Sequence, residues 1–538
     1  MENENVRYKW VGVGDLNGFF GLMFDNIAVL SSLAGTLIIG FQFPANIVYT
    51  RMIPGTTLGV LFGDLVYTWM AFRLARKKVI SNVTAMPLGL DTPSTIGLAV
   101  TVLGPAFIML KQAGHSVQDA AIMTWHLGMA TMVLIGVLKV IMSFCGNWVQ
   151  RTIPRAGLLG SLAGVGLALI GFIPLLDIFR MPLVGTLSLG LTLYALVAKG
   201  SLPGKIPGVL AAIALGTILY YLLNVVSPDT LGSNFYKIPE FHFRFGLPLP
   251  NLGFIDGFIP SLKFLPVAIP FAILTIVGGI NVTESARVAG DDYSARQILM
   301  TEALATLLSG ICGGVAQSCP YIGHPAYKRM GTRAGYTLFT ALFIGLGGVF
   351  GYVSVILEII PRAALAPILV FISLEIVGQA FKENPSIHIP AVILSILPSV
   401  SRLLAIHLEM PEIVPVQNLD HLISNVGGTL PEVLVIIALG NGFILTGMLW
   451  GSFLAEMINH RLRVCSIYCF VMALFSFFGI IHSSMPDSNV YFPWLLTGAA
   501  RMIPYEFAKC YLFLGLMMFA LSFTKDGKAP IRGALSNS

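Results

Sequence analysis

Long runs of apolar residues follow one another along most of the chain, and short polar segments separate them. Because a bilayer crossing needs about 20 apolar residues, each run predicts a membrane-spanning helix. The continuous runs cover 18–41, 55–75, 118–144, 153–176, 181–198, 206–226, 264–286, 335–359, 363–380, 387–405, 433–457, 464–484 and 506–523. Two further regions, 83–110 and 297–330, are apolar but broken by Pro and Gly. The first predicts an interrupted crossing, and the second predicts a short helix before another interrupted crossing. The pattern predicts an all-α polytopic membrane protein with about sixteen crossings.

Basic residues gather at alternate ends of these runs, which predicts the orientation of the chain. With the N-terminus inside, the inner segments include RLARKK (73–78), KRMGTR (328–333) and HRLR (460–463). About twice as many Lys and Arg then lie inside as outside, in agreement with the positive-inside rule. We therefore expect a multi-pass protein of the cell membrane with cytoplasmic N- and C-termini. The segments 227–263 and 406–432 are expected to lie outside.

Two segments repeat each other without a gap: IPRAGLLGSLAGVGLALIG (153–171) and IPRAALAPILVFISLEIVG (360–378). They are an odd number of crossings apart, so the two copies enter the membrane in opposite directions. A weaker echo pairs MPLGLDTP (86–93) with CPYIGHP (319–325), and another pairs NIAVLSSLAG with NVTESARVAG. Together they predict a seven-plus-seven inverted-repeat transporter fold.

The repeats divide the chain into five predicted regions. These are a cytoplasmic tail (1–17), the first repeat with crossings 1–7 (18–226), an external loop (227–263), the second repeat with crossings 8–14 (264–457), and a C-terminal extension with two helices and a cytoplasmic tail (458–538).

Crossings 3 and 10 are the interrupted ones. Prolines and glycines at positions 87, 89, 93, 320, 323 and 325 remove or weaken their helical hydrogen bonds. Backbone groups freed inside a membrane are tolerated only where protein or a wet cavity satisfies them. Secondary transporters use such breaks to form a substrate site near the bilayer midplane. The breaks therefore favour a transporter over an inert scaffold.

Composition agrees with this interpretation and excludes several functions. The chain is 56% hydrophobic and 11% charged, whereas soluble domains carry about 25% charged residues. The net charge of +6 is dispersed among loops and does not indicate nucleic acid binding. The six cysteines form no CxxC pair, so neither a disulfide framework nor a metal site is expected. We find no phosphate-loop, zinc or nucleophile motif, and we expect neither an enzyme nor a cofactor.

Glu284, near the end of the run 264–286, has two interpretations. It is either a membrane-embedded carboxylate that binds substrate and exchanges protons, or a solvated carboxylate that pairs with Arg287. Asp91 and His324 occupy equivalent places in the repeat, at the starts of two half-helices that should face each other. There they would bind substrate, and His324 would add a switchable charge, or each would cap its own helix. Lys139 is expected to snorkel or to be paired.

Three further residues, Gln317, Ser318 and Tyr321, offer hydrogen bonds at the crossing 10 break, and local turn chemistry is the alternative. The predicted substrate-binding residues are thus Glu284, Gln317, Ser318, Tyr321, His324 and Asp91. The predicted proton-coupling residues are Glu284 and His324.

The region from GGINVTESARVAGDD to GTRAGYT (278–337) resembles crossings 8–11 of the nucleobase–ascorbate transporter family, which includes the xanthine/uracil permeases and other nucleobase–cation symporters. The hypoxanthine/guanine permease branch is the most similar. The resemblance rests on Glu284, the small-residue segment SGICGG and the Tyr321 break. It implies a core domain (crossings 1–4 and 8–11), a gate domain (5–7 and 12–14) and a nucleobase held by Glu284. The family's second glutamate, two residues after the tyrosine, is replaced here by Gly323.

Three functions remain open at this point. The leading hypothesis is a proton-coupled secondary active transporter of a nucleobase-like heterocycle or a related small planar anion. The second is an anion exchanger or carrier of the sulfate/bicarbonate type, which shares the fold. The third is a non-transporting membrane sensor or scaffold. The expected partners are the small-molecule substrate, H+ and the lipid bilayer, and the resemblance implies a possible homodimer formed through the gate domain.

Overall fold

The structure is a computed structural model, and it describes residues 8–79, 81–200, 202–203, 206–226, 242–321, 323–409, 430, 432–485, 490–496 and 501–524. Much of the two predicted external segments (227–241 and 410–429) and of the C-terminal tail (525–538) lies outside the described residues. The predicted placement of those parts therefore stays a prediction.

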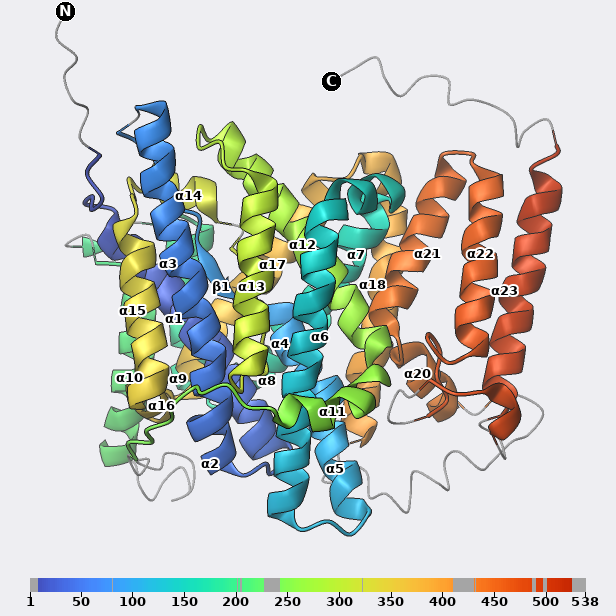
Figure 1. The fold of residues 1–538 in the computed structure, drawn as a ribbon, viewed down its shortest axis with the longest axis horizontal. Coiled ribbons are helices and arrows are strands. Elements are labelled where there is room, and N and C mark those ends of the chain that lie inside the picture. The colour runs from blue at the N-terminus through green and yellow to red at the C-terminus, as the bar shows by residue number, and fades with distance from the viewer. Residues whose placement is uncertain are drawn as a thin grey trace, which may run out of the picture. The chain divides into compact units, whose positions relative to one another are not determined.

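Apolar helices dominate the described residues (Figure 1). Ten are long and apolar enough to cross a membrane, or up to twelve when each sharply bent pair counts as one span. The ten spans are α1 with η1 (Asp15–Gly40), α2 to α3 (Ala45–Lys78), α4 to α5 (Thr92–Gln112), α6 (Val117–Thr152), α7 to α8 (Arg155–Arg180), α10 (Gly208–Val226), α12 (Leu265–Val288), α17 (Arg362–Lys382), α18 (Ile389–Glu409) and α23 (Met502–Leu521). The chain is therefore an all-α polytopic membrane protein.

The two bent pairs are α15 (Gly335–Phe350) with α16 (Tyr352–Ile359), at 92°, and α20 (Glu432–Gly440) with α21 (Phe443–Ile458), at 83°. Gly351 and Gly442 stand at these bends with φ of +81° and +70°, a backbone conformation that a side chain would strain. Four of the sixteen predicted crossings form helices too short to be counted as spans, and this explains why the structure has at most twelve spans among the described residues. They are α9 with η5 (Pro182–Val197), α13 (Ala295–Ile311), α14 (His324–Arg329) and α22 (Leu462–Phe477).

The chain divides into two compact units. The first contains residues 1–146, 170–262 and 271–372, and the second contains 147–169, 263–270 and 373–538. Crossings 1–4 and 9–11, which the resemblance assigned to a core domain, fall in the first unit, and so does crossing 8 from Phe271 onward. Crossings 6 and 7 (α9 and α10) also fall there, although the resemblance assigned them to the gate domain.

In the first unit, α3 (Ile53–Lys78) packs against α13 and α15, and α15 also packs against α1 (Asp15–Gly35), as Figure 1 shows. Glycines allow the closest approaches. A Cβ atom on Gly55 of α3 would lie 2.2 Å from the backbone nitrogen of Gly314, at the end of crossing 9. Small residues at such contacts let membrane helices approach closely and gain dispersion energy.

In the second unit, α7 (Arg155–Val165), α18 and α21 pack together, α21 contacts α22, and α22 packs along α23 (Figure 1). Gly157, Gly160 and Ser395 lie where α7 meets α18 and α21. Helices α22 and α23 are the two additional C-terminal helices that the hydropathy pattern predicts.

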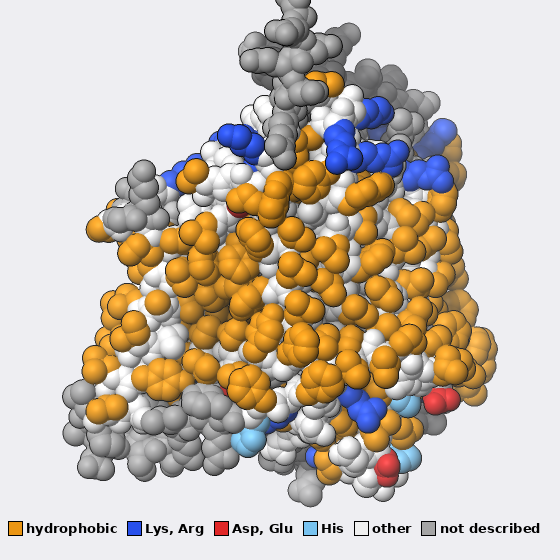
Figure 2. Space-filling model, turned by 60° about the vertical axis from the view of Figure 1, so that its left-hand side comes forward, with side chains coloured by type: hydrophobic (Ala, Val, Ile, Leu, Met, Phe, Trp, Pro, Cys, Tyr) orange, Lys and Arg blue, Asp and Glu red, His pale blue; other side chains and the backbone are white. Residues whose placement is uncertain are grey.

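Hydrophobic side chains cover the middle of the face shown in Figure 2, and Lys and Arg gather along one edge. The exposed large hydrophobic residues include Trp69, Leu346 and Phe350. An apolar belt of this kind is suited to lipid contact.

Candidate functional site: the paired breaks of crossings 3 and 10

The breaks of crossings 3 and 10 meet as two short antiparallel strands. Strand β1 (Leu88–Leu90) pairs with β2 (Ser318–Pro320), with Gly89 opposite Cys319. The ladder continues at both ends, because Asp91 N donates to Gln317 O (2.9 Å) and Tyr321 N donates to Pro87 O (2.8 Å). The backbone groups that the prolines release from helices therefore satisfy one another inside the membrane. The repeat echo between 86–93 and 319–325 correctly brings these segments together.

The free edge of β1 is held by polar side chains of crossings 1 and 2. Leu88 N donates to Asp64 Oδ1, and Leu90 N donates to Asn26 Oδ1, both at 3.0 Å. Asp25, next to Asn26, is 3% exposed, and its carboxylate lies beside Gly89, where a Cβ atom would be 3.4 Å from Oδ2. Among the described residues, neither oxygen of Asp25 has a hydrogen-bond partner. These side chains fix the strand, and Asp25 is a buried carboxylate that a proton would neutralise.

A network of charged and amide groups connects the two breaks. Lys139 Nζ of α6 lies 2.5 Å from Glu302 Oε1 of α13, and both side chains are fully buried. The same Nζ donates to Gln317 Oε1 (3.0 Å) and Ser318 O (3.0 Å). Gln317 Nε2 then donates to Asp91 Oδ2 at 3.1 Å. We call these four side chains, Asp91, Gln317, Lys139 and Glu302, the buried network, and it joins crossings 3, 4, 9 and 10.

Asp91 also caps the half-helix that follows β1. Its Oδ2 accepts from Ser94 N at 3.0 Å, at the start of α4 (Thr92–Leu98). The geometry confirms the capping interpretation of Asp91, whose carboxylate also joins the buried network, and its predicted role in substrate binding stays a prediction. Asp91, whose carboxylate accepts from Ser94 N, Gln317 Nε2 and Cys319 Sγ, is better stabilised than Asp25, which accepts none from the described residues.

Helix α12, which is crossing 8, lies beside the breaks at two adjacent glycines, Gly278 and Gly279. A Cβ atom on Gly279 would lie 3.0 Å from Glu302 Oε2 and 3.7 Å from Pro320 Cγ, so α12 comes close to both crossings 9 and 10. A Cβ atom on Gly278 would meet nothing within 4 Å. Open space therefore adjoins α12 at the level of the buried network.

The structure places His324 and Glu284 apart from this network, whereas Ser318 and Tyr321 lie at the paired breaks. His324 is fully buried at the start of α14, where Nε2 lies 3.3 Å from Asp291 Oδ2. Lys328 Nζ contacts the same carboxylate at 2.6 Å. Tyr321 is half-buried, and the centroid of its ring lies 6.1 Å from the ring centroid of Tyr327. His324 thus lies beside the Lys328–Asp291 ion pair after crossing 8, and its predicted roles in substrate binding and proton coupling stay predictions.

Glu284 lies in the last turn of α12 and is not brought to the breaks. Its side chain is 55% exposed and forms an ion pair with Arg287, whose side chain is 59% exposed. This geometry corresponds to the solvated pair that the sequence left as the alternative.

Sequence reasoning did not identify Glu302, and it placed Lys139 outside the site. The available signal was a charged residue within each of two apolar segments, 118–144 and 297–311. Intramembrane ionisable residues are functional candidates by default, with a partner to be named. Nothing in the sequence indicated that these two are partners. Among the described residues, no group of three or more His, Cys, Asp or Glu is placed to hold a metal ion.

No family model matches the sequence, and no curated protein matches it. Solved structures match the fold. The structure of murine Solute Carrier 26 family member A9, an anion transporter in the inward-facing state, aligns with a TM-score of 0.50 at 13% identity and covers 73% of this chain and 66% of that one. A second SLC26A9 structure gives 0.48 at 12% identity, over 73% of this chain and 63% of that one. This chain thus spans slightly less than two thirds of the SLC26A9 chains.

The transmembrane domain of BicA, a cyanobacterium bicarbonate transporter, aligns over 76% of this chain and 98% of that one, with a TM-score of 0.47 at 15% identity. The match to murine Slc26a9 shows the inverted-repeat fold of membrane transporters. The predicted membership of the nucleobase–ascorbate family is wrong, because the structure that carries the fold match, murine Slc26a9, is an anion transporter. Glu284, on which that resemblance most depended, forms an exposed ion pair, and its predicted roles in substrate binding and proton coupling stay predictions.

Proposed function

We propose that this protein is a secondary carrier of a small anion, which binds beside the paired breaks of crossings 3 and 10. The observation that carries the proposal is the buried network, in which Lys139 places a positive charge at the junction of the breaks. The fold supports it, since the structures that share it include anion transporters. No neighbouring atom lies within 4 Å of a Cβ placed on Gly278, so side chains do not fill the space beside α12 at this level.

Charge balance favours proton coupling as the finer form of the proposal. Lys139 is the cation of the buried network, whereas Asp91 and Glu302 are both acids, and Asp25 and Asp64 are buried nearby. Adding an anion to this acidic surrounding is unfavourable unless a carboxylate takes up a proton. Symport of the anion with H+ would meet this condition, and exchange for a second anion is the alternative that the experiment separates.

Uptake by proteoliposomes tests the function. The full chain is reconstituted, and uptake of sulfate, bicarbonate and a small carboxylate is compared with uptake of uracil and guanine. We expect saturable uptake of at least one anion, accelerated when the outside is acid and reduced by an uncoupler. Uptake that needs an internal anion and ignores the pH gradient would indicate exchange. Uptake of none of these anions would overturn the proposal.

The predicted orientation and association belong to this proposal. We propose that both termini face the cytoplasm, because the basic segments 73–78 and 328–333 then lie inside. Labelling of single cysteines placed in those segments with a membrane-impermeant reagent tests this, and labelling of intact cells would contradict it. A homodimer is tested by crosslinking in native membranes.

A further inference from the structure

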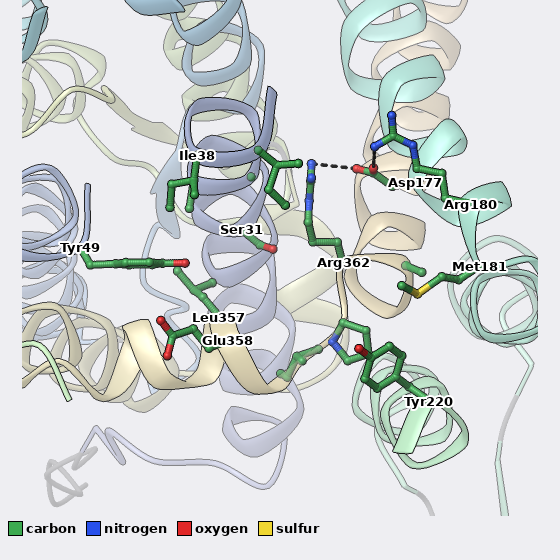
Figure 3. Close-up of a pocket in the computed structure, with 16 residues that line it drawn as sticks. Ser31, Ile38, Tyr49, Asp177, Arg180, Met181, Tyr220, Leu357, Glu358 and Arg362 are labelled. Carbon is green, nitrogen blue, oxygen red and sulfur yellow. Dashed lines mark ion pairs between the residues drawn. The ribbon is translucent and has the colours of Figure 1, made fainter. Parts of the chain in front are cut away.

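A cavity of about 330 Å³ lies in the first unit, away from the buried network. It is lined by the second half of α1, by η2 (Val48–Met52), α8 (Ile173–Arg180) and α10, and by the junction of α16 with α17. Figure 3 shows Arg362 standing between Ser31 on one side and Asp177 on the other. The rest of the wall is largely apolar and includes Ile38, Leu357 and Met181.

Two arginines share one aspartate in this cavity. Arg362 Nη2 lies 2.9 Å from Asp177 Oδ2, and Arg180 Nη1 lies 3.6 Å from Asp177 Oδ1. The second acid of the wall, Glu358, is already neutralised, because its Oε1 lies 2.5 Å from Arg244 Nη1. The two arginines and Asp177 have a formal excess of one positive charge, although the Arg180 side chain is 70% exposed and Arg362 is the arginine that lies closer to Asp177.

The position of Arg362 increases this excess. It is the first residue of α17, a helix of 21 residues, and the N-terminus of a helix carries a partial positive charge. A cation is unfavourable there unless an anion is close. The guanidinium also lies against α1, where a Cβ atom on Gly35 would be 2.3 Å from Cζ. A side chain at position 35 would therefore force the arginine to shift from its present place in the cavity.

Arg362 has further capacity to bind. A guanidinium has five N–H donors in a planar fork, and among the described residues Arg362 contacts a single carboxylate, Asp177. Its side chain is 25% exposed, so it is partly desolvated but accessible from the cavity. The fork matches two oxygens of one ligand better than it matches a spherical halide.

We propose that this cavity is a second anion site, in which a small oxyanion such as sulfate replaces Asp177 on the guanidinium of Arg362. The inference rests on the proposed function in that the bound oxyanion is taken to be one that the protein carries. Asp177 occupies the site in the absence of the ligand and competes with it. Because the ligand and Asp177 compete, loss of the arginine and loss of the aspartate should have opposite effects on affinity.

Equilibrium binding of sulfate to the purified full chain tests the site, with chloride at equal ionic strength as the reference. Arg362→Gln is expected to weaken sulfate binding about tenfold or more, since it removes a charge-assisted pair. Asp177→Asn is expected to tighten it severalfold, a change that a merely structural role would not produce. Arg155→Gln is the matched control, because Arg155 holds the equivalent place in the other IPRA segment and is exposed. It should leave sulfate binding unchanged.

The outcomes separate this site from the proposed function. Opposite effects of Arg362→Gln and Asp177→Asn, in a protein that fails to carry any anion, would support the site and overturn the function. Anion uptake together with sulfate binding that neither variant alters would support the function and overturn the site. If Arg362→Gln does not fold, Asp177→Asn decides alone, and unchanged or weaker sulfate binding in it overturns the site.

Discussion

Two of the ion pairs between a carboxylate and a basic side chain in this protein differ in almost everything except chemistry. Lys139 and Glu302 meet between α6 and α13 with both side chains fully buried. Glu284 and Arg287 meet on one turn of α12, with more than half of each side chain exposed. The first pair connects four crossings through Gln317 and Asp91, and the second connects a helix only to itself. A carboxylate near the end of an apolar run is therefore weak evidence for a site.

The physical difference is desolvation. An exposed pair keeps its water and is screened by salt, so it adds little to stability. A buried pair has lost the hydration of both ions and depends on mutual attraction and on further hydrogen bonds. Lys139 has those further bonds, to Gln317, Ser318 and Thr306. Removing one partner of such a buried pair is therefore costly. We also expect the pair to respond to a third charge, such as that of an anion that binds nearby.

The largest effect is expected from breaking the buried pair on one side. Lys139→Met leaves Glu302 charged and unpaired, which should cost about 3–5 kcal/mol of folding free energy. The measurement is the midpoint of thermal unfolding in detergent, together with the monodisperse yield. A variant as stable as the wild type would show that Glu302 does not depend on Lys139.

Removing both charges should separate stability from transport. The double variant Lys139→Met/Glu302→Met replaces the ion pair by apolar side chains of similar length, a change that is often neutral for stability. We expect it to regain most of the stability lost by Lys139→Met and to carry no anion. Its unfolding midpoint and its uptake in proteoliposomes are the measurements. A stable double variant with normal uptake would mean that the buried network only supports the fold.

A smaller effect is expected at the other end of the network. Asp91→Asn keeps the shape of the cap but replaces charge-assisted hydrogen bonds by neutral ones, at a cost of about 1–2 kcal/mol. Uptake should persist at a lower rate, with a weaker dependence on pH. Rates measured from pH 5 to 8 check this. An unchanged pH profile would show that Asp91 does not take part in coupling.

Almost no effect is expected from the exposed pair. Glu284→Gln and Arg287→Ala should leave both the unfolding midpoint and the uptake close to those of the wild type, because each partner stays hydrated without the other. The same two assays serve as controls for the buried variants. Loss of uptake in Glu284→Gln, with unchanged stability, would restore Glu284 as a site residue.

The smallest expected effect concerns pH and the exposed pair of Lys78 with Asp292, which lie 2.9 Å apart. Lys78 lowers the pKa of the Asp292 carboxyl below its ordinary value. The pair therefore stabilises the fold above the unfolded pKa of about 3.9, and this contribution is lost as the pH falls through the lower folded pKa. Lys78→Gln should reduce the loss of stability in acid slightly. Unfolding midpoints at pH 3 and pH 7 measure it, and an equal loss in both proteins would contradict the pairing.

The sequence by itself determined most of the segments that cross the membrane and where two of the crossings break. Apolar runs indicate helices because backbone groups in lipid must pair within their own segment, and Pro87 and Pro320 show where that pairing fails. The repeat then indicated that the two breaks are equivalent, which correctly associates 86–93 with 319–325. Asp91, Gln317 and Ser318 could be named for this reason, since they lie at the breaks themselves.

Only the tertiary structure decided which charges meet. Hydropathy gives the depth of a residue along its own helix, but it does not give the side of the helix on which the residue lies or the neighbour that it faces. Lys139 and Glu302 belong to different crossings, far apart in sequence, and their contact depends on how α6 and α13 pack around the strands. Glu284 and Arg287 are one turn apart, so their pairing was visible in the sequence, but their exposure was not. Burial, which makes one pair costly to break and the other nearly neutral, arises only when the helices are assembled.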